Sequence, residues 1–154
     1  MMLIGSNIII HATYPDHEDL RNLIEEQVPF VSAVSYVEIL GYHMLTEQEQ
    51  YYQEMFFDDA RVVPPSQEVL DQAVVLCKNR TMTLGGALIA GTARTYNLML
   101  ITWNMQDFQR IEDPVILNPF ETTKKALKQV IRIEVSISGS IVKLCNMVYS
   151  RFFL

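Results

Sequence analysis

Three polar side chains follow a short apolar segment of this 154-residue chain. Residues 98–102 read Leu-Met-Leu-Ile-Thr, and Thr102, Asn104 and Asp107 stand at or just after the end of that run. An apolar run of this length between turn-forming residues predicts a β-strand that is covered on both faces. In α/β proteins, ligands bind beside the loops that follow the carboxyl ends of such strands. We therefore predict that these hydroxyl, amide and carboxylate groups belong to a ligand site.

Glu38 is a second acidic candidate, with two roles that are equally consistent with the local sequence. It stands three residues after Ser35, where a segment of helical character begins. This spacing matches a capping box, in which the side chains of Ser35 and Glu38 each bind a backbone N–H of the first helical turn. Glu38 is therefore either a helix-capping residue or part of the site.

The elements that must position these groups alternate between strands and helices. We expect strands at residues 2–4, 29–33, 61–64, 98–102 and 115–117, and helices at residues 8–12, 17–27, 35–41, 47–60, 66–80 and 85–97. Helices that lead directly into short apolar strands indicate an α/β domain with a parallel sheet. We therefore expect a central, mainly parallel sheet of four or five strands with helices on both faces.

The charged residues are unevenly distributed along the chain. The net charge is −6, but residues 1–120 contain 16 acidic and 6 basic side chains, and residues 121–154 contain 2 acidic and 6 basic ones. The main body therefore has a net charge of −10 and is a poor general binder of nucleic acid, because phosphate contacts require Lys and Arg. A role with nucleic acid would require a metal ion or a local basic site.

Cysteine usage and hydropathy indicate the cellular setting. Cys77 and Cys145 form neither a disulfide framework nor a metal-binding spacing, which favours reduced thiols in a cytoplasmic protein. The N-terminus lacks the basic segment of a signal peptide. No uncharged apolar run reaches about 18 residues, the length of a membrane span. We therefore expect a single cytoplasmic domain that does not bind a membrane.

Four ordered blocks of the sequence resemble the PIN domain family. Residues 4–10 resemble its Asp-Ser/Thr-Asn opening, and residues 31–39 resemble its second block, which contains a glutamate. Residues 82–93 resemble its Gly-Asp-Ala-Leu-Ile-Ala block, and residues 100–108 resemble its Thr-Arg-Asn-x-x-Asp-Phe block. The resemblance covers residues 2–119. In size and in the second block, the chain is most similar to the VapC-type toxins of bacterial toxin–antitoxin pairs.

The resemblance implies a PIN-like fold and a divalent-metal-dependent ribonuclease activity. In this family, acidic residues from separate blocks hold Mg²⁺ or Mn²⁺ and hydrolyse RNA with a metal-activated water. Carboxylate oxygens suit these hard cations, and the cation lets an acidic protein approach an anionic backbone. Glu38 and Asp107 match the family's catalytic and metal-binding positions. The supporting oxygen donors are Ser6, Asn7, Thr102 and Asn104.

The chain departs from the family pattern at two acidic positions. Gly5 stands where the family has its first aspartate, and Gly86 stands where it has its third. Glycine has no side chain and so supplies no ligand. Trp103 also replaces a common arginine, which removes a phosphate contact. We therefore expect weak Mg²⁺ or Mn²⁺ binding and a weakened or absent ribonuclease activity.

Partners follow from the resemblance and from one apolar surface. The resemblance implies RNA as substrate and a small antitoxin protein as partner. Tyr51, Tyr52, Met55 and Phe56 form an aromatic face on the helix expected at residues 47–60, which indicates either core packing or a dimer or partner interface. The alternative to a nuclease is a non-catalytic protein that binds a partner on the PIN scaffold. A third, weaker interpretation is an acidic α/β domain whose match is only architectural.

The last segment, residues 120–154, lies outside the resemblance and forms a basic and apolar C-terminal extension. Residues 124–133 have the pattern of a basic amphipathic helix, and residues 136–140 interrupt it. The extension is either an arm that contacts RNA or a partner, or a poorly ordered appendage, which we favour because the family pattern is complete at residue 119.

Overall fold

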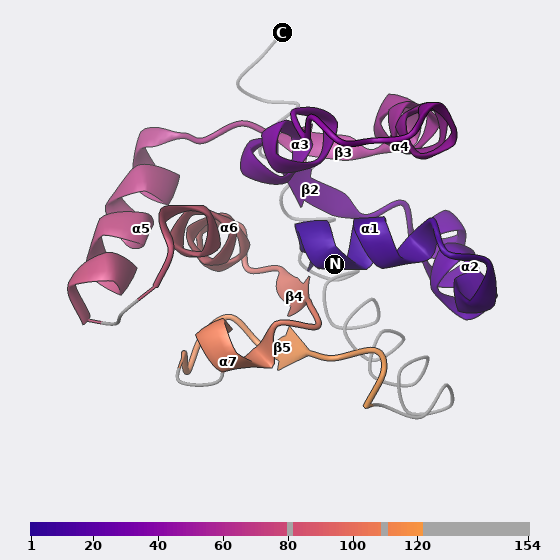
Figure 1. The fold of residues 1–154 in the computed structure, drawn as a ribbon. Coiled ribbons are helices and arrows are strands. Elements are labelled where there is room, and N and C mark those ends of the chain that lie inside the picture. Colours follow the sequence, from indigo (N-terminus) through magenta and orange to yellow (C-terminus); the bar gives the residue numbers. More distant parts are fainter. Residues whose placement is uncertain (80–81, 109–110, 122–154) are drawn as a thin grey trace, which may run out of the picture.

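The computed structural model describes residues 1–79, 82–108 and 111–121 of the chain (Figure 1). The strands are β1 (Met2–Ile4), β2 (Phe30–Ser32), β3 (Arg61–Val63), β4 (Met99–Ile101) and β5 (Ile116–Leu117). They form one five-stranded sheet in the order β3-β2-β1-β4-β5, and every neighbouring pair is parallel. The expected α/β class and parallel sheet are therefore confirmed.

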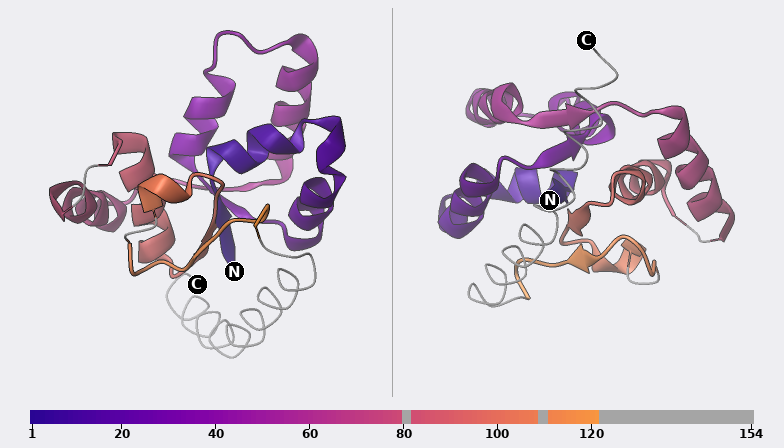
Figure 2. Two further views of the ribbon diagram at one scale, coloured as in Figure 1. Left: turned by 60° about the horizontal axis from the view of Figure 1, so that its bottom comes forward. Right: turned by 180° about the vertical axis from the view of Figure 1, so that it is seen from behind.

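Helices connect the strands and cover both faces of the sheet. They are α1 (Ser6–Ala12), α2 (Glu18–Gln27), α3 (Ala33–Leu40), α4 (Glu47–Asp59), α5 (Gln67–Asn79), α6 (Leu84–Thr95) and α7 (Met105–Phe108), with a 3₁₀ turn at Pro15–His17. Figure 1 shows α1 and α2 on one side of the sheet and α5 and α6 on the other. The left view of Figure 2 shows α3 and α4 side by side. None of the helices in the described part of the chain is long and apolar enough to cross a membrane.

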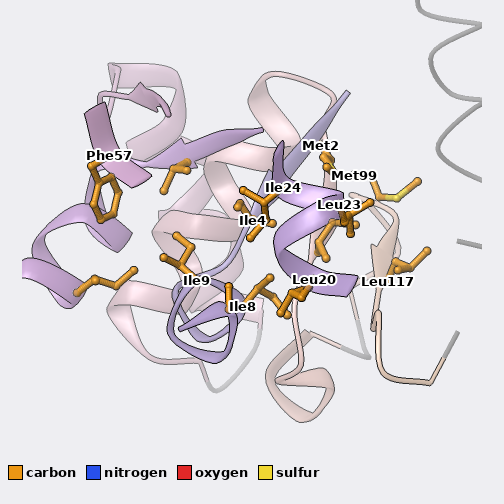
Figure 3. Packing of buried hydrophobic residues seen from close by; sticks show 14 residues of the cluster. Met2, Ile4, Ile8, Ile9, Leu20, Leu23, Ile24, Phe57, Met99 and Leu117 are labelled. Atoms are coloured by element: carbon orange, nitrogen blue, oxygen red, sulfur yellow. The ribbon is translucent and has the colours of Figure 1, made fainter. Parts of the chain in front are cut away.

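Two apolar clusters, one on each face of the sheet, form the core. Successive strand residues point to opposite faces, so Ile4 and Ile101 join the cluster under α1 and α2, whereas Leu3 and Leu100 join the cluster under α5 and α6. Figure 3 shows Ile4 packed with the α1 and α2 residues of the first cluster. All four strand residues named here are 0% exposed, as expected for a sheet covered on both faces.

The helices α5 and α6 approach each other unusually closely at Gly91. A Cβ atom at this position would lie 2.9 Å from the carbonyl oxygen of Val69 and 3.2 Å from the amide nitrogen of Ala73, both in the backbone of α5. Ala87 and Ala90 on the same helix are also completely buried. Small residues on α6 thus let the two helix backbones pack closely and fix the position of α6 over the sheet.

The capping-box interpretation of Glu38 is wrong. The helix α3 begins at Ala33 directly after β2, and Ser32 is its N-cap, with its hydroxyl accepting a hydrogen bond from the Val34 N–H at 3.3 Å. Ser35 lies in the first turn and is 0% exposed. The helix begins three residues earlier than the capping box required, so Glu38 is not at the N3 position and does not cap the helix.

One further expectation differs from the structure, and two others are only partly covered by the described residues. The segment after β4, predicted as a polar turn, contains the short helix α7. Cys77 is an exposed free thiol, whereas Cys145 lies outside the described residues. The predicted extension at residues 120–154 lies outside them too, apart from its first two residues, so the boundary at residue 119 stays a prediction.

Candidate functional site

The order of the strands creates a crevice at one edge of the sheet. From β1 the chain passes to β2 and then β3 on one side, and it later returns to β4 and β5 on the other side. Where the strand order reverses in this way, the connections lead apart and leave a crevice beyond the carboxyl ends of the central strands. Ile4 and Ile101 are paired in register at these ends, and the Gly5 N–H donates a hydrogen bond to the Ile101 carbonyl at 2.9 Å.

A pocket of about 290 Å³ occupies this crevice. Its lining comes from the ends of β1 and β4, from α1, α3 and α6, and from the segment around α7. The lining residues are Gly5, Ser6, Asn7, Ile10, Glu38, Thr83, Gly86, Ile89, Thr102, Asn104, Asp107 and Phe108. Every site residue that we predicted from the sequence, including the two glycines, is among them. The structure therefore brings the predicted residues together, while their functional roles stay predictions.

Glu38 reaches the pocket from α3 and is held by Ser6. The Ser6 hydroxyl, in the first turn of α1, donates a hydrogen bond to Oε2 of Glu38 at 2.5 Å. On the other side, a Cβ atom at Gly85 would overlap Oε1 of Glu38, so the absence of a side chain at Gly85 makes room for the carboxylate. The carboxylate thus lies against the first turn of α6, where the helix dipole favours negative charge.

Asp107 is positioned by a chain of hydrogen bonds that begins at Asn7. The Asn7 amide donates to the Thr102 hydroxyl at 3.1 Å, and this hydroxyl accepts the Asn104 N–H at 3.2 Å. The Asn104 amide then donates to Oδ2 of Asp107 at 2.8 Å. The supporting residues predicted from the sequence therefore form hydrogen bonds with one another as well as lining the pocket. Together they orient Asp107 relative to the end of β1.

The two glycines occupy positions that suit an aspartate. Gly5 is the N-cap of α1 and makes no side-chain cap, and Gly86 is the third residue of α6. A Cβ atom at Gly5 would have its nearest neighbours at 3.5 Å, an ordinary contact distance. At Gly86, the nearest neighbour would be the Thr83 hydroxyl at 3.0 Å, a side-chain atom that can move by a few tenths of an ångström. Both positions therefore have room for a side chain.

Within the described part of the chain, the charged groups that line the pocket are two carboxylates, and none is Lys or Arg. Among the described residues, no cluster of three or more His, Cys, Asp or Glu side chains is placed to hold a metal ion. Mg²⁺ is commonly bound by one or two carboxylates together with several waters. Glu38 and Asp107 fit a cation held in this loose way, and they do not fit a cage built wholly of protein ligands.

Two residues of the site escaped the sequence analysis. Thr83 lines the pocket and caps α6, with its hydroxyl accepting the Gly86 N–H at 3.0 Å. Gly85 makes room for Glu38, although only its neighbour Gly86 was singled out. A threonine three residues before Gly86 is the usual N-cap spacing and was the signal for Thr83. No local signal existed for Gly85, because its neighbour Glu38 is far away in sequence.

Comparisons with known proteins agree with this architecture. The family model described as the PIN domain matches residues 2–114. A toxin–antitoxin complex from Klebsiella pneumoniae has a TM-score of 0.65 and 23% identity, over 79% of this chain and 100% of that chain. VapBC2 from Rickettsia felis bound to a promoter DNA fragment has a TM-score of 0.65 and 22% identity, over 76% of this chain and 97% of that chain. FitAcB from Neisseria gonorrhoeae has a TM-score of 0.65 and 16% identity, over 79% of this chain and 100% of that chain. At these identities the likeness shows a shared fold, and no curated protein matches the chain.

Proposed function

The chain belongs to the PIN domain family, and from this membership we propose that it is a VapC-like toxin, a divalent-metal-dependent ribonuclease weakened or inactivated by Gly5 and Gly86. One observation carries the proposal: Glu38 and Asp107 share a single pocket with the two glycines. PIN domains are in general metal-dependent nucleases. The pocket lies where the strand order reverses, the usual place for the chemistry of an open parallel sheet.

The residues of the pocket have separate tasks in this proposal. Glu38 and Asp107 would hold Mg²⁺ or Mn²⁺. When bound, the cation would supply Lewis acidity at the phosphoryl oxygen and a bound water that loses a proton more readily than bulk water. Ser6 binds Oε2 of Glu38 and Asn104 binds Oδ2 of Asp107, so the other oxygen of each carboxylate has no hydrogen-bond donor among the described residues. These two oxygens are the ones available to a cation.

The absence of aspartate side chains at Gly5 and Gly86 explains why we expect weak metal binding and weak RNA cleavage. A site with four carboxylates attracts a divalent cation strongly, because the like charges repel one another until the cation neutralises them. With two carboxylates, both the repulsion and the attraction are smaller. We therefore expect weak metal binding and slow or absent cleavage of RNA phosphodiesters.

Restoring the two aspartates tests the proposal. Gly5→Asp and Gly86→Asp together should produce cleavage of a structured RNA that requires Mg²⁺ or Mn²⁺ and stops with EDTA. Adding Glu38→Gln or Asp107→Asn to the restored chain should abolish cleavage again, because the ligands act as a unit. The proposal fails if the restored chain does not cleave, and the predicted weakness is wrong if the unmodified chain already cleaves efficiently.

A second candidate function is partner binding without catalysis, and one surface favours it. A groove of about 390 Å³, larger than the pocket at the site, lies between α2 and α4. Tyr52 and Phe56 of the aromatic face pack partly against the core there, whereas Tyr51 and Met55 are 66% and 53% exposed. Apolar side chains left exposed on a helix are typical of an interface. The solved structures of similar fold are toxin–antitoxin complexes, and we propose a small antitoxin protein as the partner in this groove.

The two functions can be separated by variants. The proposed antitoxin is expected to be encoded by the reading frame beside this gene. Met55→Asp should prevent binding of that antitoxin and leave RNA cleavage by the restored chain unchanged. The pair Glu38→Gln and Asp107→Asn should do the reverse. Sedimentation of the isolated chain distinguishes an antitoxin from a second copy of the chain as the occupant. With RNA and an antitoxin as partners, the place of action is the cytoplasm.

A further inference from the structure

Five aromatic rings meet beside the pocket and form what we call the ring cluster, which consists of His11, Tyr14, His17, Trp103 and Phe120. The His11 and Trp103 rings have centroids 4.2 Å apart at an interplanar angle of 64°. The Phe120 ring lies 5.0 Å from Trp103 and 5.1 Å from His17, and the Tyr14 ring lies 5.4 Å from His11. These spacings and tilted angles are favourable ones for aromatic pairs, so the rings hold one another in place.

The ring cluster is presented to the solvent rather than buried in the core. Trp103 is 48% exposed, Tyr14 is 45% exposed and Phe120 is 40% exposed. None of its members belongs to either of the two apolar clusters that cover the sheet. Rings that are fixed by mutual contacts and still half exposed offer flat apolar faces at a low cost in conformational entropy.

The ring cluster adjoins the wall of the pocket. The backbone N–H of Trp103 donates a hydrogen bond to Oδ1 of Asn7 at 3.3 Å, and Asn7 lines the pocket. Trp103 also follows Thr102 directly, and His11 stands one helical turn after Asn7 on α1. A chain molecule with its backbone in the pocket would therefore have its next unit beside these rings.

Charge limits what this surface can bind. The described residues that line the pocket include no Lys or Arg, so none of them offers a polyanion an ion pair. The pKa of His11 is lowered by burial and by the neighbouring His17, which keeps its ring uncharged at neutral pH. Flat rings beside an acidic pocket can still bind the π-face of a nucleobase, because stacking requires no cation.

We propose that the ring cluster stacks an unpaired base of the RNA whose backbone enters the pocket, with Trp103 as the main platform. The inference rests on the proposed ribonuclease function and assigns the substrate class as single-stranded RNA or an RNA loop. A protein partner is the less favoured occupant, because the larger apolar groove between α2 and α4 is the better protein-binding surface.

Tryptophan fluorescence tests this proposal directly, because Trp103 is the only tryptophan of the chain. The unmodified full chain, which we expect to cleave slowly or not at all, is titrated with a short single-stranded RNA in the presence of Mg²⁺, and the RNA is checked to be intact afterwards. Base stacking should quench the Trp103 emission to saturation. A ribose-phosphate oligomer of the same length without bases should quench little, as should a fully paired duplex. Equal quenching by the oligomer without bases would overturn the proposal.

Substitutions provide the second measurement, made by the polarisation of a labelled RNA. Trp103→Ala should weaken binding on the order of tenfold, within the range observed for loss of one stacking partner, and Trp103→Phe should retain most of the affinity. Tyr51→Ala removes a more exposed ring on α4 and is the matched control, with no expected change. If Trp103→Ala binds RNA as tightly as the unmodified chain, the proposal is wrong.

The two proposals fail in different ways. If RNA quenches Trp103 and the chain with both aspartates restored cleaves nothing, base stacking stands and the nuclease function falls. If the restored chain cleaves equally well with and without Trp103→Ala, the nuclease stands and base stacking falls. If RNA does not bind and Trp103→Ala instead weakens binding of the neighbouring gene's protein, the ring cluster is a protein interface and this inference is wrong.

Discussion

At the scale of single residues, Gly5 and Gly86 permit a test that does not depend on activity. Gly5→Asp and Gly86→Asp place carboxylates at the N-cap of one helix and in the first turn of another, where negative charge is locally favourable. The same carboxylates repel Glu38 and Asp107 across the pocket. We therefore expect the doubly substituted chain to gain about 8 °C in its unfolding temperature with saturating Mn²⁺, from roughly 2.7 kcal/mol at a hundredfold excess over Kd.

Neutral side chains of the same shape control for the effect of filling the two positions. Gly5→Asn with Gly86→Asn should cap or extend the helices in a similar way and respond to Mn²⁺ no more than the unmodified chain. Each single aspartate should give an intermediate metal response. A Mn²⁺ shift equal in the aspartate and asparagine chains would show that the added carboxylates are not ligands.

A second residue-scale prediction concerns His11 and pH. Burial, and then the charge of His17, lower the pKa of His11 below its ordinary value of 6.5. Below pH 6.5 the unfolded chain takes up a proton that the folded chain resists, so stability is lost as the pH falls through this window. His11→Phe should flatten the change in the free energy of urea unfolding between about pH 7 and pH 5.5.

The matched control is His43, which lies outside the ring cluster and contacts only Tyr42 among the described rings. His43→Gln removes an imidazole without altering the ring cluster, so an effect on the pH dependence that both variants share does not come from the packing of His11. If His11→Phe leaves the pH dependence unchanged, then the packing of His11 does not couple protonation to folding. Glu49 and Glu68, whose pKa values are lowered by hydrogen bonds, act only below their ordinary value of 4.5 and do not confuse the measurement.

The residues of the pocket could be predicted because they follow strands that the sequence identifies. Thr102, Asn104 and Asp107 stand after an apolar run, and the parallel sheet brings that loop beside Ser6 and Asn7. The ring cluster could not be predicted, because it joins residues 11–17 to Phe120, and only the fold places them together. The choice between Ser32 and Ser35 as N-cap depended on where β2 ends, which local sequence does not determine within a few residues.

At the scale of elements, Gly91 tests how closely α5 and α6 must pack. An alanine in place of a glycine inside a helix normally stabilises it by about 0.5–1 kcal/mol. At Gly91 the added methyl group would meet backbone atoms of α5 at 2.9 and 3.2 Å, which cannot move aside separately. We therefore expect Gly91→Ala to destabilise the protein by about 1–3 kcal/mol in denaturant unfolding.

The comparison with Gly86→Ala separates crowding from helix propensity. Gly86 lies on the same helix, and the nearest neighbour of an added Cβ atom would be the side-chain hydroxyl of Thr83 rather than a backbone atom. Gly86→Ala should therefore be close to neutral or stabilising. A stabilising Gly91→Ala would mean that the two helices can separate at little cost and that α6 is not fixed by this contact.

The elements themselves were largely predictable, for reasons that also explain why α7 and the 3₁₀ turn at Pro15–His17 were missed. Apolar runs such as residues 98–102 are short and uncharged, so they indicate strands buried on both faces, and longer periodic segments indicate the helices between them. The helix α7 has only four residues, Met105–Phe108. A segment this short has no helical periodicity to detect in the sequence. Phe108 of α7 is buried in the cluster under α5 and α6, a contact that only the fold creates.

At the scale of the whole molecule, the question is which part of the chain forms the cooperative unit. The two apolar clusters that cover the sheet draw on residues 2–117, and the family model ends at residue 114. Residues 122–154 lie outside the described part of the chain. A domain whose sheet is already covered on both faces needs no further element for a cooperative transition. We predict that a chain ending after Glu121 unfolds in one cooperative thermal transition.

The thermal stability of a truncated chain should depend on whether the chain retains the Phe120 ring. Phe120 packs against His11, His17 and Trp103, and its N–H donates a hydrogen bond to Oδ1 of Asn118 at 3.0 Å. A chain ending after Pro119 should stay folded, but it should unfold at a lower temperature than the chain ending after Glu121. Its Trp103 emission should also shift to longer wavelength, because the indole loses a covering neighbour. If the chain ending after Glu121 loses its cooperative transition, the last 33 residues are part of the domain, and the boundary at residue 119 is wrong.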